Sequence, residues 1–380
     1  MQVELLSSDI EIKKYLQRLG VDKGGVSIMA SKAKHYIIYI KDIHVGAANI
    51  LKQDALSVGA DLAVPRGTVT AMTPRVDSIL IATQKQLSIL SKKELAQPFG
   101  LKELAVKFQD ILHVKQASHV EVMGVINAND DSFFPSSRFK DKNAIEAIEK
   151  MISDGARIID IGGVSSAPSS MIVDKDEELR RVKPILDIIK KQKLSEKVKF
   201  SIDSYEPSVI EYALRSGFSI VNDITGLSDK EVVRLCAEYN ARAVIMHMQG
   251  TPQTMQKDPK YESVLSDVYS FFETRIQEAE SMGVKDIILD TGIGFGKTLE
   301  HNLTLIKNTG HFLTLNKPVL IGASRKSMID KISPSSPQDR LAGTLALHLQ
   351  AVREGASIVR AHDVYEHVQA LKVQIALDNI

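Results

Sequence analysis

The sequence predicts an α/β fold, a (β/α)8 TIM barrel over residues 118–380 preceded by a small α/β (α+β) domain over residues 1–117. In the longer region, eight apolar, β-branched runs alternate with amphipathic helical stretches, which is the pattern of a parallel sheet covered by helices. The region also has the length that such a barrel needs. An open doubly wound sheet is the alternative, which eight sequential units without a Rossmann fingerprint disfavour. The strands are expected at 122–127, 157–163, 199–203, 219–224, 242–248, 287–292, 318–324 and 357–363.

The N-terminal domain has a weaker pattern, with short β-branched runs between helical stretches. Its strands are expected at 35–40, 61–64 and 78–83, and its helices at 9–19, 45–59 and 85–95. Residues 112–120 are expected to link the two domains. Lys52 and Arg66 are interpreted as solvated surface rather than as ligand contacts, so the sequence assigns this domain no role.

Composition narrows the classes of function. Lys plus Arg number 48 against 47 acidic residues, so nothing indicates a nucleic-acid or membrane-surface binder. No apolar run approaches the roughly 20 residues of a membrane span, and the charged residues between 9 and 14 do not fit a signal peptide. Cys236 is the only cysteine, so the chain can form no internal disulfide. We therefore expect a cytoplasmic protein.

Polar side chains stand at the end of every expected barrel strand. In a (β/α)8 barrel these ends meet at one face, which is the face that carries active sites. Single members have simpler interpretations, such as Asp363 as a helix cap and Asp160 as a brace of the barrel rim. A polar group at every strand end exceeds what helix capping explains. The set comprises Asn127, Asp160, Asp203, Asn222, Asp223, His247, Asp290, Ser324, Arg325, Lys326, Arg360, His362 and Asp363.

The set divides by chemistry into two groups. Asn127, Arg360 and His362 fit a phosphate and a metal ion, with Asn127 as a neutral oxygen ligand for Mg²⁺. The other group offers hydrogen-bond acceptors and donors for a flat heterocycle with several N–H groups. It consists of Asp203, Asn222, Asp290 and Lys326, with Ile224, Met246 and Phe295 as apolar walls.

Other catalytic chemistries find no support in the sequence. No HExxH or CxxC pattern is present for zinc, and no Ser-His-Asp or Cys-His arrangement emerges. The glycine-rich turn at 292–296 ends on Lys297 but lacks the spacing of a P-loop, which excludes an NTPase of that type.

Six motifs in the same order resemble the dihydropteroate synthases. They are FSIDSYEP, IVNDITG, VIMHMQGTPQTMQ, ILDTGIGFGKTLEHN, LIGASRKS and IVRAHDV, and the resemblance runs from residue 121 to the C-terminus. It implies an enzyme that joins 4-aminobenzoate to 6-hydroxymethyl-7,8-dihydropterin diphosphate with Mg²⁺ bound and releases pyrophosphate. The N-terminal region resembles an extension that some family members carry.

The resemblance also implies roles for individual residues. Asp203, Lys326 and Arg360 are expected to be catalytic, with Asp203 stabilising the cation that forms when diphosphate leaves the pterin. The expected pterin site is Asp203, Asn222, Ile224, Met246, Asp290, Phe295 and Lys326. The expected diphosphate site is Asn127, Ser166, Arg360 and His362, with Asn127 also the metal ligand. The aminobenzoate loops are expected to contribute Phe133, Ser166, Pro168 and Ser327. Independently of the resemblance, a homodimer is expected through helices of the last units, because the stretch 342–356 is apolar over a wide arc; burial of this arc against the barrel is the alternative.

Two loops depart from the family pattern. After the first strand the family has Asn-x-Thr-Pro-Asp-Ser-Phe, and this chain has NANDDSF at 127–133. After the second it has Gly-Gly-x-Ser-Thr-Arg-Pro, and this chain has GGVSSAP at 162–168, with Ala167 in place of the arginine. Thr291 also replaces a proline. These departures leave open a pterin-binding protein without catalysis, and a corrinoid-type pterin methyltransferase barrel is a further alternative.

Overall fold

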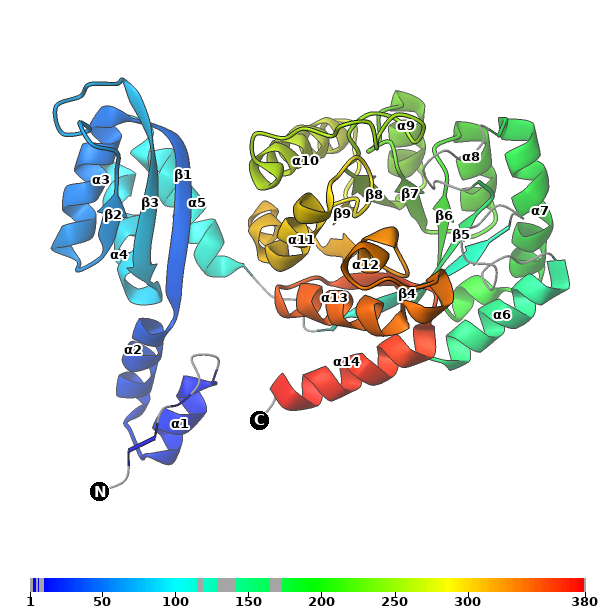
Figure 1. The fold of residues 1–380 in the computed structure, drawn as a ribbon, viewed down its shortest axis with the longest axis horizontal. Coiled ribbons are helices and arrows are strands. Elements are labelled where there is room, and N and C mark those ends of the chain that lie inside the picture. The colour runs from blue at the N-terminus through cyan, green and yellow to red at the C-terminus, as the bar shows by residue number, and fades with distance from the viewer. Residues whose placement is uncertain are drawn as a thin grey trace. The chain divides into compact units, whose positions relative to one another are not determined.

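The protein forms two compact units, Met1–Val114 and Lys115–Asn379 (Figure 1). The computed structural model describes residues 3–4, 6, 10–114, 119–128, 141–164 and 173–378. A small antiparallel sheet with helices forms the first unit, and a closed parallel barrel forms the second. The predicted fold class, a TIM barrel preceded by a small mixed domain, is confirmed.

The N-terminal unit is a three-stranded sheet with helices on one face. The strands run antiparallel in the order β1 (His35–His44), β3 (Arg75–Thr83), β2 (Asp61–Ala63). Along β3, buried and exposed residues alternate, so Leu80 enters the core while Ile79 and Ile81 are 39% and 45% exposed. The helices are α1 (Ile12–Arg18), α2 (Lys23–Ala33), α3 (Val45–Ser57), α4 (Gln84–Lys93) and α5 (Leu101–His113).

Two of these helices, α2 and α5, were not predicted. Gly24 and Gly25 in the first turn of α2 lower its helix propensity, so the sequence pattern does not predict this helix. Helix α5 packs on α4 and brings Leu101 and Phe108 into the core of this unit. The core therefore depends on a helix that runs into the first two residues of the linker expected at 112–120, so that prediction begins too early.

All eight predicted barrel strands are present. They are β4 (Glu121–Asn127), β5 (Ile158–Gly162), β6 (Lys199–Asp203), β7 (Ile220–Asp223), β8 (Arg242–Met246), β9 (Ile287–Asp290), β10 (Val319–Ile321) and β11 (Ile358–Ala361). Each pairs in parallel with its neighbours in sequence, and the pairing of β11 with β4 closes the barrel. Figure 1 shows the helices around the outside of the strands. They are α6 (Asp141–Ser153), α7 (Lys175–Lys191), α8 (Pro207–Arg215), α9 (Lys230–Glu238), α10 (Val264–Ser281), α11 (Leu299–Lys307), α12 (Ser327–Ile332), α13 (Leu341–Arg353) and α14 (Val364–Asp378).

An apolar layer fills the barrel and sets the level of the polar residues above it. The layer consists of Met123, Ile158, Ile220, Val244, Ile288, Leu320 and Ile358, one from each of seven strands. Because side chains of a strand alternate between faces, the residue two positions further along also points inward. That step leads from Ile220 to Asn222, from Ile288 to Asp290 and from Ile358 to Arg360. Asn222, Asp290 and Arg360 thus lie in the next layer toward the carboxyl ends of the strands.

Among the described residues, no helix is long and apolar enough to cross a membrane.

Candidate active site at the mouth of the barrel

Arg360 joins two carboxylates inside the barrel. Its Nε donates to Oδ2 of Asp160 at 2.6 Å, and its Nη2 donates to Oδ2 of Asp203 at 2.7 Å. Asn222 on β7 donates from Nδ2 to the same Asp160 oxygen at 3.0 Å. Asp160 is completely buried, and its bond to Arg360 offsets part of the cost of burying both charges. Four strands thus contribute to one hydrogen-bonded cluster.

The electrostatics of this cluster favour a ligand that carries N–H groups or positive charge. Burial raises the pKa of Asp203 to about 7, while Arg360 pulls that pKa down. Although burial opposes the charge of Arg360, the two aspartates raise its pKa above the ordinary value. Asn222 Oδ1 is buried and has no hydrogen-bond partner among the described residues. A buried acceptor without a donor is costly, so a ligand N–H at this place would remove that cost.

The glycine-rich turn after β9 is held against the end of β8. Oδ1 of Asp290 accepts from the N–H of Gly292 at 2.8 Å, which turns the chain directly after the strand. Gly292 and Gly296 have φ of +63° and +61°, a region that side chains rarely adopt. A Cβ on Gly292 would lie 2.0 Å from the carbonyl oxygen of His247. Only glycine permits this close approach of the two segments.

The buried side chain of Lys297 holds the turn in place through hydrogen bonds to its backbone. Its side chain is 2% exposed, and Nζ donates to the carbonyl oxygens of His247, Gly292 and Phe295 at 3.1, 3.1 and 2.9 Å. Nζ also lies 2.9 Å from Nδ1 of His247. Burial lowers the pKa of Lys297 to about 7 and that of His247 to about 3, so the imidazole is neutral. Lys297 therefore acts on the backbone of the turn.

Lys326, predicted as a polar group of the site, and Phe295, predicted as one of its apolar walls, lie against each other. Nζ of Lys326 lies 4.5 Å from the centroid of the Phe295 ring, and it donates to the carbonyl oxygen of Ile293. Burial lowers the pKa of Lys326 to about 8. Met246 pairs with Asp290 across the strands and is buried, and Ile224 is buried just after β7.

The end of β11 is tied to the loop after β10. Nδ1 of His362 lies 2.9 Å from Oγ of Ser324, and burial lowers the pKa of His362 to about 3. Beside this contact, Arg325 donates to both carboxylate oxygens of Asp363 at 2.9 and 2.6 Å. The interpretation of Asp363 as only a helix cap therefore misses its ion pair. Ser327, expected near the aminobenzoate, is exposed at the first residue of α12.

Comparison with known proteins agrees with this geometry. The family described as pterin binding enzyme matches residues 123–362, from β4 to the end of β11. The chain belongs to the pterin-binding enzyme family. A Helicobacter pylori protein named bifunctional dihydropteroate synthase/dihydropteroate reductase is 42% identical over 100% of this chain and 99% of its own length. The dihydropteroate synthase of Escherichia coli is 39% identical over 67% of this chain and 91% of its own length.

A solved structure supports the same membership. The dihydropteroate synthase of Thermus thermophilus, in complex with 4-aminobenzoate, has a TM-score of 0.61 and 38% identity. It covers 68% of this chain and 95% of its own length. The synthases from Escherichia coli and Thermus thus match a part of this chain that has the size of the barrel unit. The Helicobacter relative matches the length of both units.

Several predicted site residues of this pterin-binding enzyme lie where the structure gives no description. Phe133, Ser166 and Pro168 are outside the described residues, as is Ala167, the departure from the family pattern. Asn127 is described and ends β4. The predicted Mg²⁺ site therefore rests on Asn127. In the described part of the chain, no group of three or more His, Cys, Asp or Glu side chains could hold a metal.

Two residues of the site were missed as functional by sequence reasoning. Asp160 was interpreted as a brace of the barrel rim, and it holds both Arg360 and Asn222 in place. The spacing of the glycines excludes Lys297 as a P-loop lysine and indicates no other role, whereas the structure shows that its bonds hold the turn that carries Phe295. The position of Asp160 two residues beyond the buried Ile158 was the available signal for an inward-pointing carboxylate.

Proposed function

We propose that this chain is a dihydropteroate synthase, which condenses 6-hydroxymethyl-7,8-dihydropterin diphosphate with 4-aminobenzoate to give 7,8-dihydropteroate and pyrophosphate. The convergence of Asp203, Asn222, Asp290 and Lys326 at one mouth of the barrel carries the proposal. These side chains surround a place that offers hydrogen-bond acceptors, one cation and an aromatic wall. A pterin ring presents N–H donors, ring nitrogens and a flat face that complement them.

The reaction follows a dissociative substitution at the pterin methylene. The C–O bond to diphosphate breaks and its electron pair leaves with pyrophosphate, while the ring nitrogens spread the positive charge left on the methylene. Asp203 faces this charge and stabilises it electrostatically, and Arg360 neutralises the leaving group. The arylamine nitrogen then forms the new C–N bond and loses its proton to solvent.

Mg²⁺ belongs to this proposal, with Asn127 as its ligand. Mg²⁺ is commonly held by one or two protein oxygens together with substrate phosphates and water, so a single side-chain oxygen at the end of β4 fits. When bound, the ion supplies charge neutralisation to the diphosphate. Chelation with EDTA should abolish turnover and added MgCl₂ should restore it, whereas turnover that is unchanged in EDTA would remove the metal from the proposal.

Pyrophosphate release by the purified full chain tests the activity. The assay contains the pterin diphosphate, 4-aminobenzoate and Mg²⁺, and mass spectrometry identifies the dihydropteroate. Pterin binding without release of pyrophosphate would favour the non-catalytic alternative. Methyl transfer from a methylated pterin to a corrinoid would favour the methyltransferase alternative. Arg360 and His362 of the sequence RAHD argue against it, because they fit a diphosphate.

A second activity, reduction of 7,8-dihydropteroate, is proposed for the N-terminal unit. It is supported by the full-length match to the Helicobacter relative, whose name includes dihydropteroate reductase, while the Escherichia coli synthase, whose name lacks that word, matches 67% of this chain. Reduction adds hydride to carbon and a proton to nitrogen of the C=N bond. The only cysteine, Cys236, is buried in α9, so no dithiol can supply electrons. The hydride must come from a reduced nicotinamide or flavin.

The reductase is tested with the full chain, 7,8-dihydropteroate and NADPH, with and without reduced flavin. A product two mass units heavier than the substrate is expected in at least one mixture. If neither donor gives this product, the second activity is absent from this chain.

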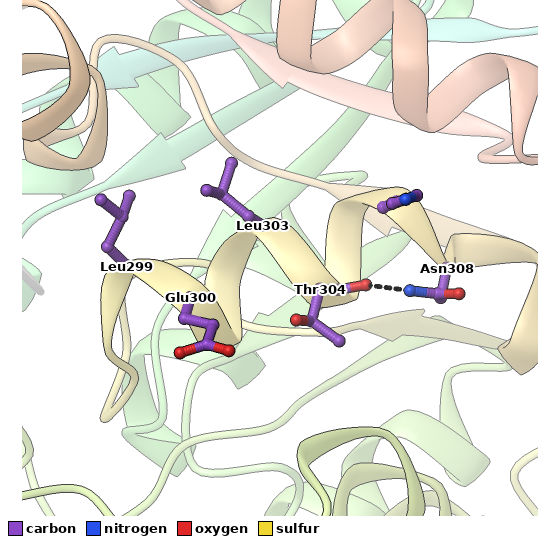
Figure 2. A pocket seen from close by; sticks show the side chains of 6 residues that line it. Leu299, Glu300, Leu303, Thr304 and Asn308 are labelled. Carbon is purple, nitrogen blue, oxygen red and sulfur yellow. Dashed lines mark hydrogen bonds between the residues drawn. The ribbon is translucent and has the colours of Figure 1, made fainter.

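The homodimer is proposed through the outer faces of α11 and α13, which are neighbours in the barrel. Helix α13 turns Thr344, His348 and Ala351 inward and leaves Leu345 and Leu349 half-buried. Figure 2 shows the pocket along α11, of about 580 Å³, lined by residues that include Leu299 and Leu303. A partner subunit would cover these leucines. Light scattering should give twice the 41.9 kDa of one chain at micromolar concentration, and the mass of one chain would refute the dimer.

A further inference from the structure

Three side chains at one face of α13 bind the backbone of the loop 323–326. His348 accepts at Nε2 from the N–H of Ala323 at 2.9 Å. Thr344 Oγ1 accepts from the N–H of Arg325 at 2.9 Å, and Arg340 Nη1 donates to the carbonyl oxygen of Arg325 at 3.2 Å. Successive members of the set are four residues apart, so Arg340, Thr344 and His348 form one stripe that begins at Arg340, the N-cap of α13.

The stripe places polar side chains in the buried contact between α13 and the loop, where apolar side chains are more common. Thr344 and His348 are 0% and 1% exposed. Burying polar groups stabilises a fold only when each finds a partner, and apolar side chains of similar shape would fill this space at less risk. The stripe satisfies backbone groups of a loop that has no regular secondary structure between β10 and α12.

The loop needs such support because Arg325 has φ of +56°, in the left-handed region. A residue other than glycine is unfavourable in this conformation unless the surrounding structure holds it. Both backbone polar groups of Arg325 are bound by the stripe, and its guanidinium is bound to Asp363 and to the carbonyl oxygens of Pro337 and Gln338. Arg325 thereby faces away from the site while Lys326, the next residue, lies over Phe295.

His348 extends the stripe to the end of β11. Because its Nε2 accepts from Ala323, its proton sits on Nδ1 and points at Nε2 of His367, 2.9 Å away. His367 in turn donates from Nδ1 to the carbonyl oxygen of Asp363 at 2.6 Å. Both imidazoles are neutral in this arrangement. The chain of bonds connects the loop that carries Lys326 to the strand end that carries His362.

We propose that Arg340, Thr344 and His348 are positioning residues that fix the loop 323–326, so that Lys326 stays over Phe295 and Ser324 stays against His362. The consequence for substrates rests on the proposed synthase activity, which assigns Lys326 to the pterin and His362 to the diphosphate. None of the three stripe residues needs to touch a substrate, because each acts through the backbone of the loop.

Thr344→Val tests the proposal, since it keeps the shape of the side chain and removes the acceptor for Arg325. The KM for the pterin diphosphate should rise roughly tenfold, the size of effect that one lost buried hydrogen bond gives. The KM for 4-aminobenzoate should change less. Thr344→Ser restores the hydroxyl and should return the pterin KM to within about threefold of the native value.

Thr309→Val is the matched control. Thr309 is also completely buried and its hydroxyl donates to the carbonyl oxygens of Leu305 and Ile306, away from the loop. It should lower the melting temperature about as much as Thr344→Val and leave the pterin KM unchanged. If both valine variants raise this KM equally, Thr344 supports the fold in general and the positioning role is wrong.

Hydrogen exchange separates this proposal from the proposed function. The amides of Ala323 and Arg325 should exchange faster in Thr344→Val than in the native protein, and stay protected in Thr309→Val. Should Thr344→Val not fold, His348→Gln is expected to give the same faster exchange at Ala323. Unchanged protection in the folded stripe variants overturns the positioning role, whereas changed protection in a protein without turnover contradicts only the synthase activity.

Discussion

The two halves of the barrel mouth reach their geometry by different means. The strand-borne half consists of Asp160, Asp203, Asn222 and Arg360, whose side chains bond to one another. The loop-borne half consists of the turn 291–297 and the loop 323–326. There, side chains bond to backbone: Lys297 to three carbonyl oxygens of the turn and its neighbour, and Thr344 and His348 to amides of the loop.

The two halves differ in whether the residues proposed to bind the ligand also hold the site in place. In the strand-borne half, the sheet register alone places each group, so the residues that hold the site together include those proposed to face the ligand. In the loop-borne half, Phe295 and Lys326 are proposed to face the ligand but owe their positions to groups that do not. Substitutions in the first half should therefore damage the reaction, and substitutions in the support of the second should damage binding.

Asp203→Asn is expected to have the largest effect. The amide keeps the shape of the carboxylate and removes the charge that faces the cationic methylene. The rate should fall roughly 100- to 1000-fold, as expected for one electrostatic contact to the transition state, while pterin affinity stays near that of the native protein. Steady-state kinetics and a pterin titration measure the two quantities. A near-native rate would remove Asp203 from the mechanism.

The pH dependence of the native protein follows from the same carboxylate. Because burial raises the pKa of Asp203 to about 7, the carboxylate is the main form only above that pH. The kcat/KM for the pterin diphosphate should therefore fall as the pH drops through about 7. The profile of Asp203→Asn should lack this limb, and a limb that persists in the variant would assign the titration to another group.

Lys297→Met tests the loop-borne half, where the expected effect is on binding. Methionine fills a similar volume but removes the lysine donor from the carbonyl oxygens of His247 and Phe295, while that of Gly292 keeps the N–H of Phe295 at 3.0 Å. Buried acceptors without partners cost about 1–3 kcal/mol each, and a loss of about 2 kcal/mol in affinity is about thirtyfold. Pterin affinity should fall by about that factor, with a smaller change in kcat.

Lys191→Met is the control for this substitution, because Lys191 is exposed at the end of α7. It should change neither affinity nor melting temperature. If Lys297→Met binds pterin as tightly as the control does, the turn does not depend on its lysine.

Three of the four residues of the strand-borne half could be assigned to the site from sequence, and the reason is physical. Asp203, Asn222 and Arg360 each follow an apolar β-branched run, and parallel strands of a barrel bring such positions to one face without further information. Family resemblance then gave these positions roles. The closure of the barrel followed from eight sequential β/α units, and the level of its polar layer needed only the alternation of side chains along each strand.

The support of the loop-borne half could not be predicted in this way. Thr344 and His348 sit in an apolar helical segment, where their spacing indicates only a shared face and says nothing of which amides they bind. Lys297 follows glycines whose turn could be formed in several ways. In the N-terminal unit, Gly24 and Gly25 conceal a helix that tertiary packing stabilises.

Ala167→Arg gives the smallest expected effect and concerns a residue that belongs to neither half. Ala167 lies outside the described residues, and it stands where the family has an arginine. A charged hydrogen bond is worth about 1.5–3 kcal/mol, so its absence should raise the KM for 4-aminobenzoate in the native protein. The restored arginine should lower this KM about tenfold, while the pterin KM stays constant because both halves of the mouth are unchanged. Ala167→Gln adds comparable length without charge and should not improve the KM. If the native KM is already low micromolar and arginine leaves it unchanged, the altered loop binds the arylamine without that charge.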